Sequence, residues 1–243
     1  MVQTKNASLS YKDGFRDGLP IALGYLSVSF TFGITAVSMG LSPLTAILIS
    51  MTNLTSAGQV AGIGIIAAGG GYIEMALAQL IINMRYALMS LSLSQKLEQK
   101  YSIRDRIITA FGITDEVFAV AAGKGRDISA RYMYGLITLP YIFWAAGTAF
   151  GAILGGILPD FIKSALGIAI YGMFIAIVIP PAKKSRGVLG VAVVAAVLSC
   201  ILYYVPVFSF ISSGISIIIC TIIAAALGAL LFPQDIKEDS ENE

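Results

Sequence analysis

Eight apolar segments, each close to the length that crosses a lipid bilayer, take up most of this chain and restrict what it can fold into. A membrane-spanning helix needs about 20 mostly apolar residues, and only short loops separate these segments. The segments run over residues 19–39, 44–68, 72–93, 107–123, 132–157, 165–179, 188–205 and 210–232. The sequence therefore predicts an all-α integral membrane protein with a single transmembrane domain over residues 19–232.

The composition agrees with a lipid-embedded fold. Hydrophobic residues make up 57% of the chain and charged residues 12%, whereas a soluble domain carries about 25% charged residues. A globular core of this size could not bury so much apolar surface, so we expect the surplus to face lipid. The net charge of +2 is too small to indicate a nucleic-acid partner.

The two ends of the chain differ from the apolar segments. Residues 1–18 are polar and lead into a span of full length without a cleavage site, so we expect a cytoplasmic N-terminal segment rather than a cleaved signal. Residues 233–243 are acidic and predict a disordered tail. The chain has no histidine, and Cys200 and Cys220 both lie inside apolar segments. These features predict no zinc site, no disulfide and no cofactor.

The basic residues restrict how the segments cross the membrane. Clusters of Lys and Arg precede the first segment and follow the third, fourth and sixth segments. Because such clusters mark cytoplasmic loops, all four can be cytoplasmic only if two segments fail to cross. The second and fourth segments have polar centres, at 53–59 and 115–116. We therefore predict six full spans plus two broken or re-entrant segments, with both termini cytoplasmic; seven or eight crossings with one basic loop outside is the alternative.

The third apolar segment carries Asn83, Arg85 and Tyr86 at its polar positions. Arg85 lies about 12 Å deep, measured from the charged loop along the helix, which is too deep for its side chain to reach the interface. We expect it to meet an internal anion. That anion is either Asp115 or Glu116 in a structural ion pair, or the carboxylate of a substrate, which a guanidinium fork fits well.

Two other polar groups lie within apolar segments. Asp115 and Glu116 could carry a coupling proton, because burial and mutual repulsion raise the pKa of at least one of them. They could instead cap or hydrate a loop near the membrane surface. The stretch that contains Asn53, Ser56 and Gln59 offers uncharged polar groups that could bind the polar end of a zwitterion.

The first span carries a stripe of small polar residues that includes Ser27, Thr31 and Thr35. Their spacing places them on one helix face, where they either line a substrate path or allow a neighbouring helix to pack closely. The tetrapeptide Phe-Gly-Ile-Thr occurs at 32–35 and again at 111–114. An internally duplicated transporter would produce such a repeat, but the flanking residues do not match.

The order of these features resembles the AzlC family, the large subunit of branched-chain amino acid exporters. The resemblance runs from about residue 13 to residue 232. The residues that carry it are Asp17-Gly18-Leu19-Pro20, Phe32-Gly33, Ala57-Gly58-Gln59, Asn83-Met84-Arg85-Tyr86, Thr114-Asp115-Glu116 and Leu158-Pro159-Asp160. The position of Val60 departs from the pattern, since family members often have a small residue there.

The resemblance implies export of leucine, isoleucine, valine and analogues such as azaleucine, together with a small hydrophobic partner subunit of the AzlD type. The residues themselves predict a polar site at the membrane midplane. In this hypothesis Arg85 binds the substrate carboxylate, and Asp115 or Glu116 carries the coupling proton or receives the amino group. Asn53, Ser56 and Gln59 coordinate the polar end, and Asn83 and Tyr86 complete the substrate-binding residues.

Three other functions remain as alternatives. An intramembrane enzyme lacks support, because the chain has no Gly-x-Ser-x-Gly motif and no histidine to act as a base. A membrane subunit of an ATP-driven transporter would need a separate ATPase, since the chain has no Walker A motif. A structural subunit that forms a path only together with another chain is the third alternative.

Overall fold

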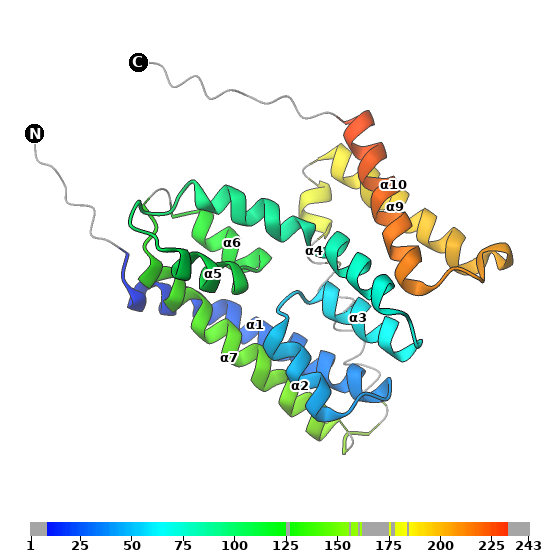
Figure 1. Ribbon diagram of the computed structural model, residues 1–243, viewed down its shortest axis with the longest axis horizontal. Helices are drawn as coiled ribbons and strands as arrows, with labels where there is room; N and C mark the ends of the chain where they lie inside the picture. The colour runs from blue at the N-terminus through cyan, green and yellow to red at the C-terminus, as the bar shows by residue number, and fades with distance from the viewer. Residues whose placement is uncertain are drawn as a thin grey trace, which may run out of the picture.

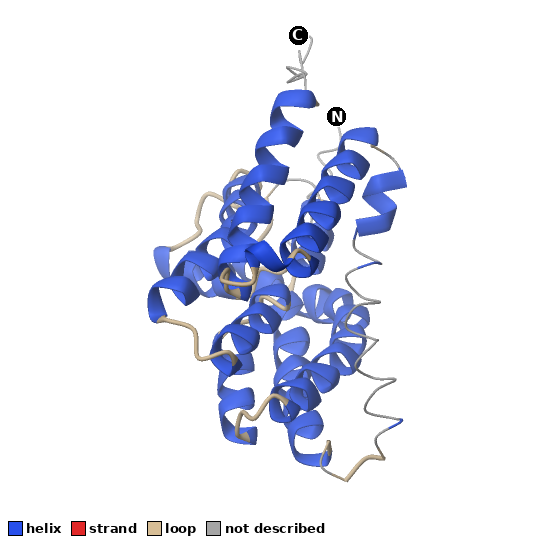
Figure 2. Ribbon diagram, turned by 90° about the vertical axis from the view of Figure 1, so that its right-hand side faces the viewer, coloured by secondary structure: helices blue, strands red, loops and turns tan. Residues whose placement is uncertain are grey.

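The computed structural model describes residues 9–124, 127–155, 157–159, 161, 175, 178–183 and 185–232, and these residues form helices and loops without any strand (Figure 2). Most of segment 165–179 and the tail 233–243 lie outside the described residues. Five of the helices are long and apolar enough to cross a bilayer. They are α1 (Tyr11–Ser38), α4 (Tyr72–Ser94), α7 (Ala130–Leu154), α9 (Arg186–Tyr204) and α10 (Ser213–Leu231). The prediction of an all-α membrane protein is confirmed.

Helices α1 and α7 lie side by side and run in the same direction (Figure 1). A methyl group added at Gly14 would lie 2.0 Å from the carbonyl oxygen of Tyr132, and one added at Gly33 would lie 2.3 Å from that of Thr148. Only glycine allows two backbones to approach this closely. The glycines therefore make α1 and α7 a closely packed pair, against which the broken segments pack.

The second apolar segment is broken into α2 (Pro43–Thr52) and α3 (Ala57–Ala67). Helix α2 starts with proline in its first turn, where the missing N–H costs nothing, and the Ser42 side chain caps it. The chain then becomes extended at Asn53, and Ser56 adopts a φ of 49° before α3 begins. The polar stretch thus interrupts the helix, as the sequence predicts.

The two halves of this segment turn back on each other. Ala46 of α2 and Ile63 of α3 belong to the same buried hydrophobic cluster as Ala152, near the end of α7. Between them, the backbone oxygen of Met51 accepts a hydrogen bond of 3.1 Å from the hydroxyl of Tyr141, near the middle of α7. The chain therefore enters from the end where α7 finishes, turns at mid-height and returns. We call residues 43–67 the α2–α3 hairpin.

The fourth apolar segment is also broken, into α5 (Ile103–Phe111) and α6 (Asp115–Ala122). The side chain of Thr114 caps α6 by accepting a hydrogen bond of 3.3 Å from the backbone N–H of Val117. Gly112 ends α5, so the second Phe-Gly-Ile-Thr stretch spans a helix break, whereas the first lies inside α1.

This segment turns back from the opposite end. At its start, the hydroxyl of Tyr134 donates to Asp105, near the beginning of α7. At the turn, Phe111 packs on Tyr141, with ring centroids 6.0 Å apart. After the turn, Lys124 at the end of α6 pairs with Asp17 of α1 at 2.8 Å. We call residues 103–122 the α5–α6 hairpin.

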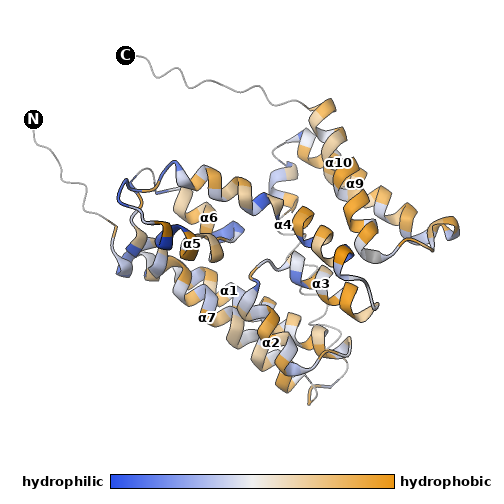
Figure 3. Ribbon diagram, viewed as in Figure 1, coloured by the Kyte–Doolittle hydropathy of each residue, from blue (hydrophilic) through white to orange (hydrophobic). Residues whose placement is uncertain are grey.

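Hydrophilic residues gather at the end of the bundle where α1 and α7 begin, as Figure 3 shows. At this end lie Lys12, Arg16, Lys96, Arg104, Arg106, Lys124 and Arg131. At the opposite end, Glu74 of α4 accepts hydrogen bonds from Ser212 Oγ (2.5 Å) and the Gly214 N–H (3.0 Å). This contact attaches the α9–α10 pair to α4, while α9 itself has no buried residue in the described part of the chain.

Candidate functional site

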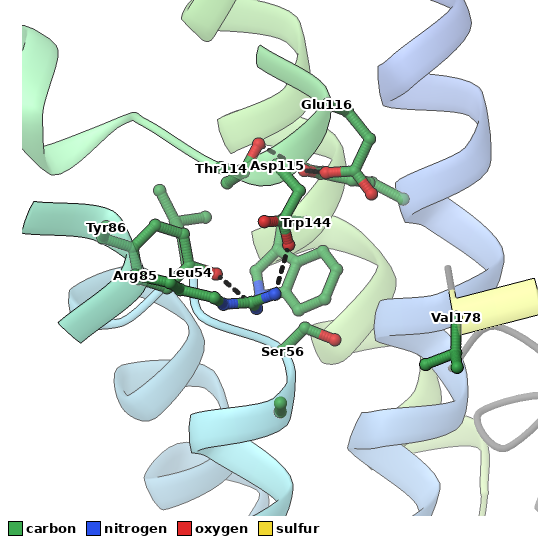
Figure 4. A pocket seen from close by; sticks show the side chains of 11 residues that line it. Leu54, Ser56, Arg85, Tyr86, Thr114, Asp115, Glu116, Trp144 and Val178 are labelled. Carbon is green, nitrogen blue, oxygen red and sulfur yellow. Dashed lines mark hydrogen bonds and ion pairs between the residues drawn. The ribbon is translucent and has the colours of Figure 1, made fainter. Parts of the chain in front are cut away.

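The turns of the two hairpins meet beside the middle of α1 and α7 and enclose a cavity of about 150 Å³ (Figure 4). The α2–α3 break and the α5–α6 break each contribute three residues to its wall, and α1, α4, α7 and the segment before α9 contribute the others. The lining residues are Leu54, Ser56, Ala57, Thr114, Asp115, Glu116, Tyr25, Arg85, Tyr86, Trp144 and Val178.

An ion pair between Arg85 and Asp115 closes one side of the cavity. Nη1 of Arg85 lies 2.8 Å from Oδ2 of Asp115, and both side chains are about one-third exposed, at 39% and 32%. Nη2 of Arg85 donates a 3.1 Å hydrogen bond to the hydroxyl of Tyr86, and the guanidinium lies 4.9 Å from the centre of the same ring. Arg85 therefore pairs with Asp115 rather than Glu116 and is held by a neighbouring ring.

Glu116 points to a different partner. Its Oε2 accepts a hydrogen bond of 2.5 Å from the hydroxyl of Tyr25, which also lies 2.6 Å from Oγ1 of Thr114. Among the described residues no cation pairs with Glu116. The lining residues thus include one guanidinium and two carboxylates, so the cavity has one more potential negative charge than positive charge.

Two helices begin at the cavity, and both present their positive N-terminal ends to it. The first turn of α6 contains Asp115 and Glu116, whose charges suit the positive end of the helix. Helix α3 begins at Ala57 without a side-chain cap, and in its first turn the N–H of Gly58 donates a hydrogen bond of 3.3 Å to the carbonyl oxygen of Thr55. Such an end favours an anionic group.

The apolar wall is centred on Trp144, the only tryptophan in the chain. Its ring packs edge-on against Tyr25, with centroids 5.0 Å apart, and its Nε1 donates a hydrogen bond of 3.1 Å to Oε1 of Gln59. Leu54 and Val178 complete this side. The cavity therefore combines a charged side with an apolar side, the arrangement that a zwitterion with an aliphatic side chain requires.

The residues expected from the sequence to bind substrate fall into two groups. Ser56, Arg85 and Tyr86 line the cavity, as do Asp115 and Glu116. The other three lie behind its wall. Of these, Asn53 ends α2, Gln59 is buried in α3 between Ser50 and Trp144, and Asn83 donates to Gln79 at 3.0 Å.

No residue of the polar stripe on α1 is among the described residues that line the cavity. The hydroxyls of Ser27, Thr31 and Thr35 donate hydrogen bonds to carbonyl oxygens of their own helix, one turn earlier. The glycines that contact α7 lie on another face. A substrate path along this stripe therefore stays a prediction.

Several lining residues were not expected from the sequence, namely Tyr25, Leu54, Ala57, Thr114, Trp144 and Val178. Thr114 had a recognisable signal, because a threonine followed by two acidic residues is typical of a capped helix start. The aromatic residues had none, since an apolar span contains many residues of that kind.

Comparison with known proteins identifies the family. The model of the AzlC protein family matches residues 20–158, more than half of the chain and both hairpins. The chain belongs to the AzlC family. The family assignment made from the sequence motifs is thus confirmed.

Several AzlC relatives are named as membrane proteins. The inner membrane protein YgaZ of Escherichia coli is 30% identical over 213 residues, covering 84% of this chain and 87% of the relative. An uncharacterized membrane protein of Archaeoglobus fulgidus is 34% identical over 182 residues, covering 72% and 80%. The branched-chain amino acid transport protein AzlC of Bacillus subtilis is 22% identical over 171 residues, covering 67% and 66%. No solved structure matches the chain.

Proposed function

We propose that this protein is a secondary transporter, not an enzyme, and that it exports leucine, isoleucine, valine and analogues such as azaleucine across the bacterial inner membrane. The name of the Bacillus subtilis relative supports the substrate class. The observation that carries the proposal is the cavity where two broken segments meet, with Arg85, Asp115 and Glu116 on one side and Trp144 on the other. Charged groups at such a depth are costly and are retained when a solute uses them.

In this proposal the substrate carboxylate binds Arg85 and the open start of α3, next to Ser56. The ammonium group binds Asp115 or Glu116, and the aliphatic side chain packs on Trp144. A cavity of about 150 Å³ holds a group of roughly the size of benzene. The substrate side chain fits this volume, whereas the whole amino acid requires the Arg85–Asp115 contact to open.

Glu116 is the proposed carrier of the coupling proton. In the described part of the chain its hydrogen-bond partner is a neutral hydroxyl, that of Tyr25, so a proton on Glu116 removes a charge without breaking an ion pair. Asp115 could take this role only after releasing Arg85. Asn53, Gln59 and Asn83 act behind the wall by holding the hairpin turn and Trp144, and Ser27, Thr31 and Thr35 would line the path to the cavity.

We further propose that both hairpins are re-entrant, which gives six full spans and two cytoplasmic termini. Each hairpin returns to the end from which it starts, and a chain that does so inside a bilayer does not cross it. The basic residues around α1, α5, α6 and α7 lie at one end, which this topology makes cytoplasmic. Cysteines introduced at Gly70 and at Arg104 would then be labelled from opposite sides of the membrane.

A small hydrophobic subunit of the AzlD type is the proposed partner. Helix α9 supports this proposal because it is strongly apolar and none of its residues is buried by the described part of the chain. Co-expression with such a subunit, followed by purification and reconstitution, tests whether leucine efflux needs it. Full efflux from vesicles that contain this chain alone would contradict the need for a partner.

The central experiment measures leucine efflux from loaded proteoliposomes, with and without a proton gradient. We expect the wild type to export leucine faster than empty vesicles do, and Arg85→Ala to lower the rate at least about tenfold, since hydrogen bonds to charged groups contribute about 1.5–3 kcal/mol. Arg104→Ala is the matched control, because Arg104 is exposed on α5, away from the cavity. Equal rates for wild type and Arg85→Ala would overturn the assignment.

A further inference from the structure

Three side-chain oxygens converge on Gly58, at the start of α3 and on the side that faces α4. The position that a side chain on residue 58 would take lies 2.3 Å from Oγ1 of Thr55, 2.8 Å from Oε1 of Gln79 and 3.1 Å from Oδ1 of Asn83. Glycine suits this position because a methyl group would collide with the Thr55 and Gln79 oxygens and crowd that of Asn83. What remains beside Gly58 is a cluster of hydrogen-bond acceptors.

The orientation of the two amides follows from one contact. Nε2 of Gln79 lies 2.7 Å from the carbonyl oxygen of Gly58, and only the nitrogen end of an amide can donate to a carbonyl. Oε1 of Gln79 therefore faces Asn83, whose Nδ2 donates to it at 3.0 Å. This leaves Oδ1 of Asn83 turned toward Gly58, so rotating either amide would break a hydrogen bond.

Two of these oxygens have no donor. Oγ1 of Thr55 and Oδ1 of Asn83 are buried, and no hydrogen-bond donor among the described residues reaches either of them. A buried polar atom without a partner costs about 1–3 kcal/mol, so such atoms normally mark a bound ion, a water or a ligand. We infer that the α2–α3 break binds a sodium ion through Thr55, Asn83 and Gln79.

The chemistry of the cluster selects a monovalent cation. All three groups are neutral oxygens, whereas calcium and magnesium sites use carboxylates and transition-metal sites use imidazole or thiolate. No group of three His, Cys, Asp or Glu side chains that could hold a metal exists among the described residues. The negative end of α2 also lies at this break, and transporters use broken-helix ends together with oxygen groups to bind sodium.

The sodium site is separate from the cavity. Ser56 and Ala57 line the cavity, whereas Thr55, Gln79 and Asn83 do not. The hairpin turn thus presents its helix start to the cavity and its acceptor oxygens to α4. A sodium ion here would fix the turn that forms one wall of the cavity, so this inference goes beyond the proposed function and does not depend on the substrate or direction of transport.

The test follows thermal unfolding of the purified full chain by the fluorescence of Trp144, in choline chloride, NaCl and KCl of equal concentration. We expect saturating sodium to raise the unfolding midpoint by about 2–4 °C relative to choline, as binding to the folded state alone does. Potassium should raise it less. An equal midpoint in NaCl and choline chloride would overturn the inference, and a larger rise with potassium would overturn the choice of sodium.

Two variants separate the site from a general effect of salt. Thr55→Val removes Oγ1 with little change of shape and should abolish the sodium-dependent rise. Thr52→Val is the matched control, because Oγ1 of Thr52 already donates to the carbonyl oxygen of Leu48 at 2.7 Å, and it should keep the rise. If Thr55→Val does not fold, equilibrium dialysis of the wild type with radioactive sodium decides, and a lack of saturable binding excludes the site.

Discussion

The two hairpins have the same architecture but carry different chemistry. Each enters from one end of the α1–α7 pair, turns near Tyr141 and returns. The α2–α3 turn offers neutral groups, such as Ser56 and the oxygens around Gly58, whereas the α5–α6 turn offers two carboxylates. The neutral groups of the α2–α3 turn can therefore orient a ligand, and the carboxylates of the α5–α6 turn can gain or lose a proton.

The two turns are also held in place differently. Thr114 caps α6 within its own hairpin. The α2–α3 turn has no such cap, and Ser56 adopts a positive φ, which costs about 1–3 kcal/mol in a residue other than glycine. Inside the turn, Oδ1 of Asn53 accepts a hydrogen bond of 3.2 Å from the Thr55 N–H, and other helices hold the turn through the Gln79 contact to Gly58 and the Tyr141 contact to Met51. The neutral turn is therefore the one that combines a strained residue with contacts from α4 and α7.

The largest expected effect comes from comparing the loss of a charge at one turn with the loss of a neutral hydroxyl at the other. Asp115→Asn removes the ionic partner of Arg85, and we expect leucine efflux to fall at least about tenfold. Ser56→Ala removes one neutral hydroxyl, for which we expect a loss of no more than about threefold. Efflux rates at equal protein content in vesicles measure both. Equal losses in the two variants would show that the hairpins do not divide the work as described.

The next effect concerns the glycines at the two turns. In Gly58→Ala the new methyl group meets Oγ1 of Thr55 and the Gln79 amide, which is held by hydrogen bonds to Gly58 and Asn83, so we expect a loss of about 2–3 kcal/mol in unfolding free energy. In Gly112→Ala it meets only the side chain of Ile137, which can move, and we expect about 1 kcal/mol.

Gly64→Ala is the control for these two changes, because nothing lies within 4 Å of a methyl group there. It should leave the unfolding midpoint unchanged or raise it slightly, since alanine favours a helix more than glycine does. Chemical denaturation in detergent measures all three variants. A greater loss at Gly112 than at Gly58 would reverse the comparison.

A smaller effect distinguishes the two carboxylates of the α5–α6 turn. Glu116→Gln keeps an oxygen for the hydroxyl of Tyr25 but cannot release a proton. We expect leucine efflux without a gradient to stay within about threefold of wild type, while stimulation by a proton gradient is lost. Efflux measured at a series of imposed pH gradients tests this, with Tyr25→Phe as a companion variant that should shift the pH dependence. Full stimulation in Glu116→Gln would assign the proton to another group.

The smallest effect concerns the starts of the hairpins. Hydrogen bonds from Ser102, and then from Tyr134, hold the pKa of Asp105 below its ordinary value. A lowered pKa means that this stabilisation is present above the ordinary pKa of 3.8 and is lost as the pH falls through the lowered value. Helix α2 starts at the uncharged Ser42, so its start has no such dependence.

Thermal unfolding in mildly and strongly acidic buffers measures this contribution. The midpoint of the wild type should fall on acidification by slightly more than that of Asp105→Asn, which lacks the titrating group. Ser42→Ala should lower the midpoint by the same amount at every pH. A midpoint difference between wild type and Asp105→Asn that does not change with pH would contradict the assignment.

Much of the fold and part of the site were predictable from the sequence. The spans follow from local hydropathy, and the two breaks follow from polar residues at the centres of apolar segments, because each signal is contained in a short stretch of chain. Arg85, Asp115 and Glu116 were identifiable because a charge within a span is conspicuous wherever its partner lies. The family motifs gave the same assignment as the family model.

The amino-acid sequence by itself thus determined where the helices lie, where they break and which charges lie within apolar segments. Only the tertiary structure decided that Arg85 pairs with Asp115, that Tyr25 contacts Glu116 and that Trp144 forms the apolar wall. These partners lie on different helices, and whether they meet depends on the close packing of α1 on α7 and on the direction in which each hairpin turns. Such contacts are set by the packing of whole helices, which no short stretch of sequence specifies.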